Sequence, residues 1–174
     1  MITAKELRAE VLLALPDAIS NYEDNKETNV RIVEEVRASI KDLADGIIPN
    51  ANHIAELAAA VNENIQMRDF LMGLRSEESV APYVHRYLEL IGGVLIKEAA
   101  VPVVTVFSTY LYEIGEKEAA QNLLQDVLET RPGYSLAELL SRTFRSDAPT
   151  DMMAEMAKDL HKSVLAIIYE KETE

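Results

Sequence analysis

Apolar residues recur every three or four positions along most of this 174-residue chain, the spacing that gathers them on one side of an α-helix. One such series is Val33, Val36, Ile40 and Leu43. The run from Val101 to Val106 is rich in β-branched residues and would also suit a buried strand. No second segment of comparable strength is available to pair with it, and an unpaired strand leaves its backbone hydrogen bonds unmade. We therefore predict a compact all-α fold of about eight helices.

Local signals indicate where several helices begin and end. Thr3 and Glu6 have the spacing of a capping box, which predicts the start of the first helix. Pro16 is expected to end or kink that helix, because its ring clashes with the preceding turn. The pair Gly92–Gly93 is expected to end a later helix. The boundaries favour a single domain over 1–174, with an N-terminal helical pair (1–46), a helical core (50–147) and a C-terminal amphipathic helix (150–170).

The segment 101–131 has a pattern more specific than amphipathicity, that of a tetratricopeptide helical hairpin. Gly115 permits a tight turn, and Ala120 lets the second helix approach the first closely. Leu124 fills the space between the helices, and Pro132 stops the pair. No second copy follows at the repeat spacing of about 34 residues. We expect one such hairpin inside a larger helical domain, with a degenerate repeat array as the alternative.

Parts of the same region carry a family resemblance. The stretches 114–120 (IGEKEAA) and 131–140 (RPGYSLAELL), with the upstream 67–71 (MRDFL) and the dipeptide Ala148–Pro149, resemble the C-terminal half of an actinobacterial and actinophage family. That family is domain of unknown function 4192. The resemblance covers roughly residues 50 to 150 and implies an all-helical region and an actinobacterial or phage origin. Family members are longer, so their N-terminal half is expected to be missing here, and the family brings no known activity, ligand or catalytic residue.

Charge and composition exclude several classes of function. The chain has 30 acidic and 17 basic residues, a net charge of −13, and no cysteine. Such a charge disfavours direct binding to nucleic acid or to an anionic membrane. The absence of cysteine excludes disulfides, thiolate zinc sites and a cysteine nucleophile. The N-terminus lacks the basic start and long apolar stretch of a secretory signal, and no segment is apolar enough to span a membrane, so we expect a cytoplasmic protein.

Few residues suggest chemistry. His85 and Glu89 share one side of a predicted helix, but a metal site needs more ligands than these two. We therefore predict no catalytic residue, no metal site and no cofactor. Arg68 and Asp69 are sequence neighbours, which do not face each other on a helix, so each is expected to bond a different helix end or partner, as a partly buried ion pair that organises the junction.

Aromatic and methionine side chains are the best candidates for an interface. Tyrosine offers rigid amphipathic contact area, and methionine an adaptable one. The alternative is that these side chains line the core, the tyrosines with their hydroxyl groups reaching water. The candidates are Tyr83, Tyr87, Tyr110, Tyr112, Met152, Met153 and Met156.

Three functional hypotheses follow. The first is a non-enzymatic helical module that binds a partner protein or a second copy of itself. A second is an acidic decoy that imitates nucleic acid and occupies a DNA-binding host protein, although the acids are spread evenly along the chain. A third is an enzyme whose site assembles from scattered residues such as His85, Arg86, Tyr87 and Glu89.

Overall fold

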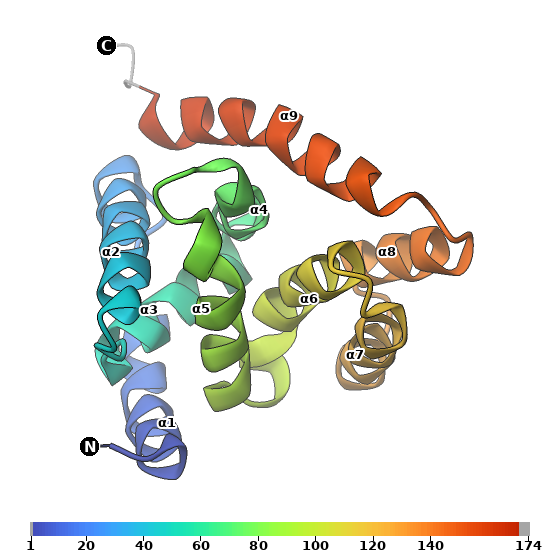
Figure 1. Cartoon of the computed structure of the whole chain (residues 1–174). Coiled ribbons are helices and arrows are strands. Elements are labelled where there is room, and N and C mark those ends of the chain that lie inside the picture. Colours follow the sequence, from blue (N-terminus) through green and yellow to red (C-terminus); the bar gives the residue numbers. More distant parts are fainter. Residues whose placement is uncertain (1, 171–174) are drawn as a thin grey trace.

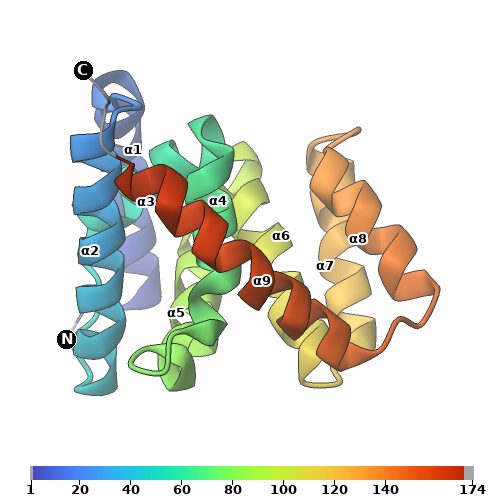
Figure 2. The same cartoon turned by 90° about the horizontal axis from the view of Figure 1, so that it is seen from above.

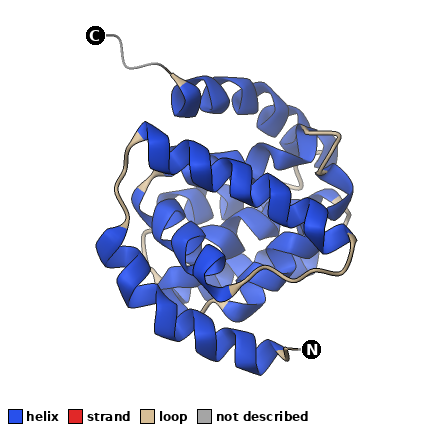
Figure 3. Cartoon of the chain, turned by 90° about the vertical axis from the view of Figure 1, so that its left-hand side faces the viewer, coloured by secondary structure: helices blue, strands red, loops and turns tan. Residues whose placement is uncertain are grey.

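Helices and the short loops between them make up residues 2–170, the part of the chain that the computed structural model describes (Figure 3). The predicted all-α fold is confirmed: the described residues contain nine α-helices, one short 3-10 helix and no strand. Met1 and residues 171–174 of the predicted domain lie outside the described residues. The elements are α1 (Ala4–Asn21), α2 (Lys26–Ala44), α3 (Ala51–Glu63), α4 (Ile65–Gly73), the 3-10 helix η1 (Leu74–Ser76), α5 (Ala81–Val94), α6 (Lys97–Glu113), α7 (Lys117–Thr130), α8 (Ser135–Arg145) and α9 (Thr150–Tyr169).

Two hydrophobic cores lie on opposite sides of α6. The larger core joins α1 to α6 with the C-terminal part of α9, and Phe70 and Leu71 of α4 are fully buried in it. The smaller core lies between α6, α7, α8 and the start of α9. Figure 1 shows α7 and α8 at one end of the molecule and α1 and α2 at the other. In Figure 2, α9 crosses diagonally over the layer between these two ends. Both α6 and α9 therefore connect the two cores.

The valine-rich middle of the chain is helical, as predicted. It forms α6, which packs closely against α7 after a tight turn. Gly115 in this turn has a φ of +89°, a conformation that favours glycine. Ala120 and Leu124 of α7 are fully buried against α6. A strand would have been left without a partner, since no strand occurs among residues 2–170.

At the N-terminus the structure confirms one prediction and corrects another. Glu6 N–H donates to the Thr3 hydroxyl (3.2 Å), and Thr3 N–H donates to the Glu6 carboxylate (2.7 Å), so the capping box forms. Pro16, however, does not end the helix, because α1 continues to Asn21. Pro16 lies on the exposed side of α1, where water can bind the Leu12 carbonyl that loses its N–H partner.

The helix predicted to end at Gly92–Gly93 ends one residue later, at Val94, so both glycines lie in the last turn of α5. Neither glycine has the positive φ that would reverse the chain. A Cβ atom added at Gly92 would lie 3.5 Å from the Val104 side chain of α6. An alanine at this position would therefore make an ordinary van der Waals contact with α6.

A polar cluster attaches α9 to the larger core. Arg37 of α2 donates to both carboxylate oxygens of Glu77, at 2.7 and 2.9 Å, and His161 of α9 pairs with the same carboxylate at 2.7 Å. Near the end of α9, the Tyr169 hydroxyl donates to Glu34 and accepts from Arg37. Burial alone would raise the pKa of Glu77, but the hydrogen bonds from His161 and Arg37 outweigh it and lower this pKa to about 2.

The lowered pKa of Glu77 predicts a loss of stability in acid. Above its ordinary pKa of 4.5, Glu77 is ionised in both the folded and the unfolded chain, and the stabilisation is complete. Between that pH and about 2, only the unfolded chain takes up the proton, so stability falls. The wild type is expected to have a higher free energy of unfolding than Glu77→Gln at neutral pH. After a discount for solvent screening, we expect this difference to shrink by about 1–2 kcal/mol across this pH range. Urea unfolding of both proteins at several pH values measures this difference, and a difference that does not change with pH would contradict the prediction.

Candidate functional site

Helix α1 is apolar on two opposite sides. Its inner side packs on α3 and α5 and buries Leu7 and Val11. Its outer side exposes Leu13 to 81% and Ile19 to 54%, which is unusual for side chains of this size. An amphipathic surface helix normally has one apolar side, which faces the core, so a second apolar side left exposed is unusual. We call the exposed side the α1 outer face; it comprises Ala9, Leu12, Leu13, Pro16 and Ile19.

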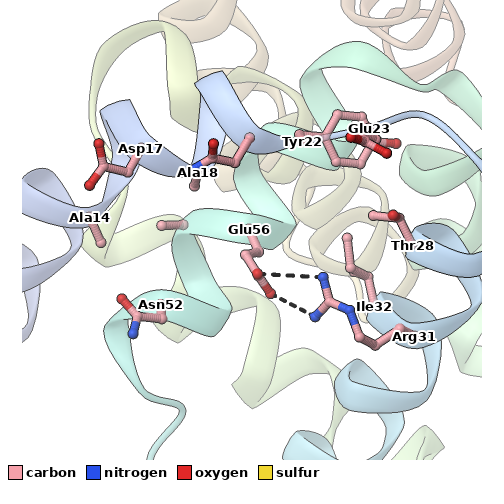
Figure 4. Close-up of a pocket in the computed structure, with 12 residues that line it drawn as sticks. Ala14, Asp17, Ala18, Tyr22, Glu23, Thr28, Arg31, Ile32, Asn52 and Glu56 are labelled. Carbon is pink, nitrogen blue, oxygen red and sulfur yellow. Dashed lines mark hydrogen bonds and ion pairs between the residues drawn. The ribbon is translucent and has the colours of Figure 1, made fainter.

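A groove made of three adjoining cavities runs beside the α1 outer face. The first (about 500 Å³) lies between α1 and the start of α3, and Leu13 lines it, so the outer face and the groove are continuous. The second (about 330 Å³) lies between α1, α2 and α3, with Ala14 and Ala18 on one wall (Figure 4). The third (about 620 Å³) lies between α2 and α3. Asn52 lines all three cavities, so they adjoin one another on the surface.

Carboxylates dominate the charge of this groove. One arginine lines it, Arg31, which donates to Glu56 (2.9 Å) and to Glu35 (2.8 Å); Figure 4 shows Glu56 reaching across the second cavity toward Arg31. The hydrogen bonds that Arg31 donates to Glu56 and Glu35 raise its pKa further above the ordinary value. We name this feature the acidic groove, and the carboxylates that line it are Glu10, Asp17, Glu23, Glu35, Asp42 and Glu56.

His53 lies at the base of the third cavity. Its Nε2 atom is 2.8 Å from the hydroxyl of the fully buried Tyr87, and its Nδ1 atom is 3.8 Å from the Glu35 carboxylate. Burial lowers the pKa of His53, although Glu35 and Glu56 oppose this, and burial raises the pKa of Tyr87 well above its ordinary value. A neutral ring has one N–H, so a donating Tyr87 hydroxyl leaves the proton on Nδ1, facing Glu35.

This arrangement supplies hydrogen-bond donors, acceptors and negative charge rather than a nucleophile. The Tyr87 hydroxyl is sealed from solvent and occupied by His53. Across residues 2–170 no three histidine, aspartate or glutamate side chains are placed to hold a metal ion. The groove can therefore bind cationic groups through its carboxylates and apolar groups through its alanines and Leu13.

The structure corrects the predicted interface at three of its four tyrosines, which are core residues. Tyr87 bonds His53, Tyr110 donates to the Leu71 carbonyl (2.9 Å), and Tyr112 donates to the Ala148 carbonyl (2.6 Å). Each hydroxyl finds a partner inside the protein, so none has to reach water. Tyr83 alone of the four is exposed, at 39%.

The predicted methionines divide in the same way. Met153 is buried in the smaller core, so the prediction that it lies at an interface is wrong. Met152 packs partly against that core, and Met156 is 56% exposed on the outer side of α9. The acidic groove is lined by none of the predicted interface residues that remain at the surface, which are Tyr83, Met152 and Met156.

The residues suggested for an enzyme site are not gathered around a cavity of the groove. His85 packs edge-on against the Phe107 ring, with its Nε2 atom buried, while Arg86 and Glu89 are exposed to solvent. Tyr87 points instead to His53.

The prediction for Arg68 and Asp69 is confirmed in part. A partly buried ion pair forms, and Arg68 also donates to the Tyr134 hydroxyl (3.4 Å), but the ion pair joins the two neighbours to each other. The Arg68 guanidinium donates twice to one Asp69 oxygen, at 2.9 and 2.7 Å. The long arginine side chain folds back along the helix surface, and partial burial of both groups strengthens the pair.

The fold and the site define a small all-α domain with an apolar helix face beside an acidic groove. A family model described as Domain of unknown function (DUF4192) matches residues 3–150, and the chain therefore belongs to this family. The match corrects the expected limit to a C-terminal half, because it includes α1 and α2, whereas most of α9 lies beyond it. Neither a curated protein nor a solved structure matches the chain. None of the helices within residues 2–170 has the length and apolar character needed to cross a membrane.

Proposed function

We propose that this protein is a non-enzymatic interaction module that binds a helix of a partner protein on the α1 outer face. The observation that carries the proposal is the second apolar side of α1, where Leu12, Leu13 and Ile19 are exposed at 42–81%. The acidic groove beside it offers a recess for side chains that flank the partner's apolar stripe. Helix-in-groove recognition uses such a combination of an apolar stripe and flanking polar contacts.

Three finer assignments accompany this proposal. The α6–α7 pair is a single tetratricopeptide-like unit, as supported by the turn at Gly115 and by the close packing at Ala120 and Leu124. Such a unit cannot bury both of its sides alone, and here α5 and α8 cover α6 and α7. The protein works in the cytoplasm, and it originates from an actinobacterium or one of its phages.

Selection from a library of displayed peptides tests the binding surface. The peptides are about 20 residues long, with apolar residues fixed at helical spacing and all other positions randomised. We expect the enriched peptides to lose at least about tenfold in affinity for Leu13→Asp, because the substitution places a charge in the centre of the contact. Leu139→Asp is the matched control, since Leu139 is an exposed leucine on α8. Equal affinity for both variants would place the binding surface elsewhere.

A further inference from the structure

The charge around the α1 outer face identifies the chemistry of its occupant. After Arg8, the remaining charged residues of α1 are Glu10 and Asp17. These two are seven residues apart, so they lie on the same side of the helix, along the edge that faces the acidic groove. The bases of α1 are Lys5 and Arg8 in its first turns; Lys5 is exposed at the N-terminal end of the α1 outer face, and the Arg8 guanidinium already donates to the Gly93 carbonyl.

Beyond this edge, the groove adds more negative charge. Its second and third cavities are lined by Glu23, Glu35, Asp42 and Glu56. Its arginine, Arg31, is held between Glu35 and Glu56 and can neutralise only part of that charge. An apolar stripe bordered by carboxylates is complementary to an apolar stripe bordered by lysine or arginine.

From this complementarity we propose that the partner is a basic amphipathic helix, with its apolar side on the α1 outer face and its lysine or arginine side chains in the acidic groove. This inference rests on the proposed function and specifies its partner. A second copy of the chain is a poor occupant. Each copy has a net charge of −13, and a two-fold contact would bring Glu10 and Asp17 of both copies into one interface.

The same peptide library tests this inference when three proteins are compared. The first is the wild type, the second is Glu10→Gln/Asp17→Asn, and the third is the matched control Glu118→Gln/Asp126→Asn on α7, where both carboxylates are exposed. Both double variants change the net charge equally, so non-specific attraction of cations changes equally in both.

We expect the positions that flank the apolar stripe to be enriched in lysine and arginine with the wild type and with the α7 control. With Glu10→Gln/Asp17→Asn we expect this enrichment to disappear and the best wild-type peptide to bind about tenfold more weakly at low ionic strength. Peptides that need Leu13 but show no basic enrichment would overturn the inference and leave the proposed function standing. Light scattering supplies a second readout: a dimer that Leu13→Asp disperses would make the second copy the occupant and overturn the basic-helix inference.

Discussion

Replacing Gly73 with alanine is expected to destabilise the protein by at least about 2 kcal/mol and to loosen α9. Gly73 ends α4 directly beneath His161 of α9. An added Cβ atom would come within 2.7 Å of the His161 Cβ atom, and closer still to the imidazole ring. The ring is held by Glu77 on one side and stacks on Phe70 at 5.9 Å, so it cannot turn away without breaking these contacts.

Two further variants separate this clash from the general effect of a glycine-to-alanine change. Gly93→Ala, in the last turn of α5, meets no atom within 4 Å and should stabilise the protein by up to about 1 kcal/mol. His161→Gly removes both the ring and the obstructing Cβ atom, so in that background Gly73→Ala should cost much less than in the wild type. Chemical denaturation of the four proteins of this double-mutant cycle measures the coupling. Additive effects of the two substitutions would show that the Gly73–His161 contact is not the cause.

The spacing of apolar residues was enough to predict the all-α fold class, because residues three and four positions apart lie on the same side of a helix. The prediction for α6 needed one more argument, the absence of a partner for a strand, and the structure confirms it. Helix ends were harder to predict. Pro16 breaks a helix only where its surroundings do not compensate, and here water can bind the exposed carbonyl that loses its N–H partner.

The candidate site was largely missed because spacing does not say which side of a helix is covered. The tyrosine pair Tyr83 and Tyr87 is one turn apart, yet Tyr87 is fully buried and Tyr83 is 39% exposed. A signal for the α1 outer face was present in the apolar run from Val11 to Leu15, which is too long for one side of a helix. The acidic groove has no such signal, since α1, α2 and α3 meet only in the folded chain.

Replacing Phe144 with alanine is expected to cost about 3–5 kcal/mol and to unfold one end of the molecule before the other. Phe144 of α8 is 2% exposed and stacks on Tyr112 of α6, with ring centroids 4.1 Å apart and an angle of 5° between the rings. It is the largest side chain that α8 contributes to the smaller core, and it shares that core with Leu124 and Met153. Its loss leaves a cavity that the surrounding helices can close only in part.

The two-core architecture makes this effect local. The larger core contains no residue of α7 or of α8 among its buried members, so α1 to α5 keep their packing when the smaller core is opened. Hydrogen exchange followed by mass spectrometry should therefore show Phe144→Ala losing protection in α7 and α8, while α2 and α3 stay protected. Leu139→Ala, on the exposed side of the same helix, should change stability by no more than about 0.5 kcal/mol. Equal loss of protection in α3 and α7 would mean that both cores unfold as one cooperative unit, with α6 transmitting the damage between them.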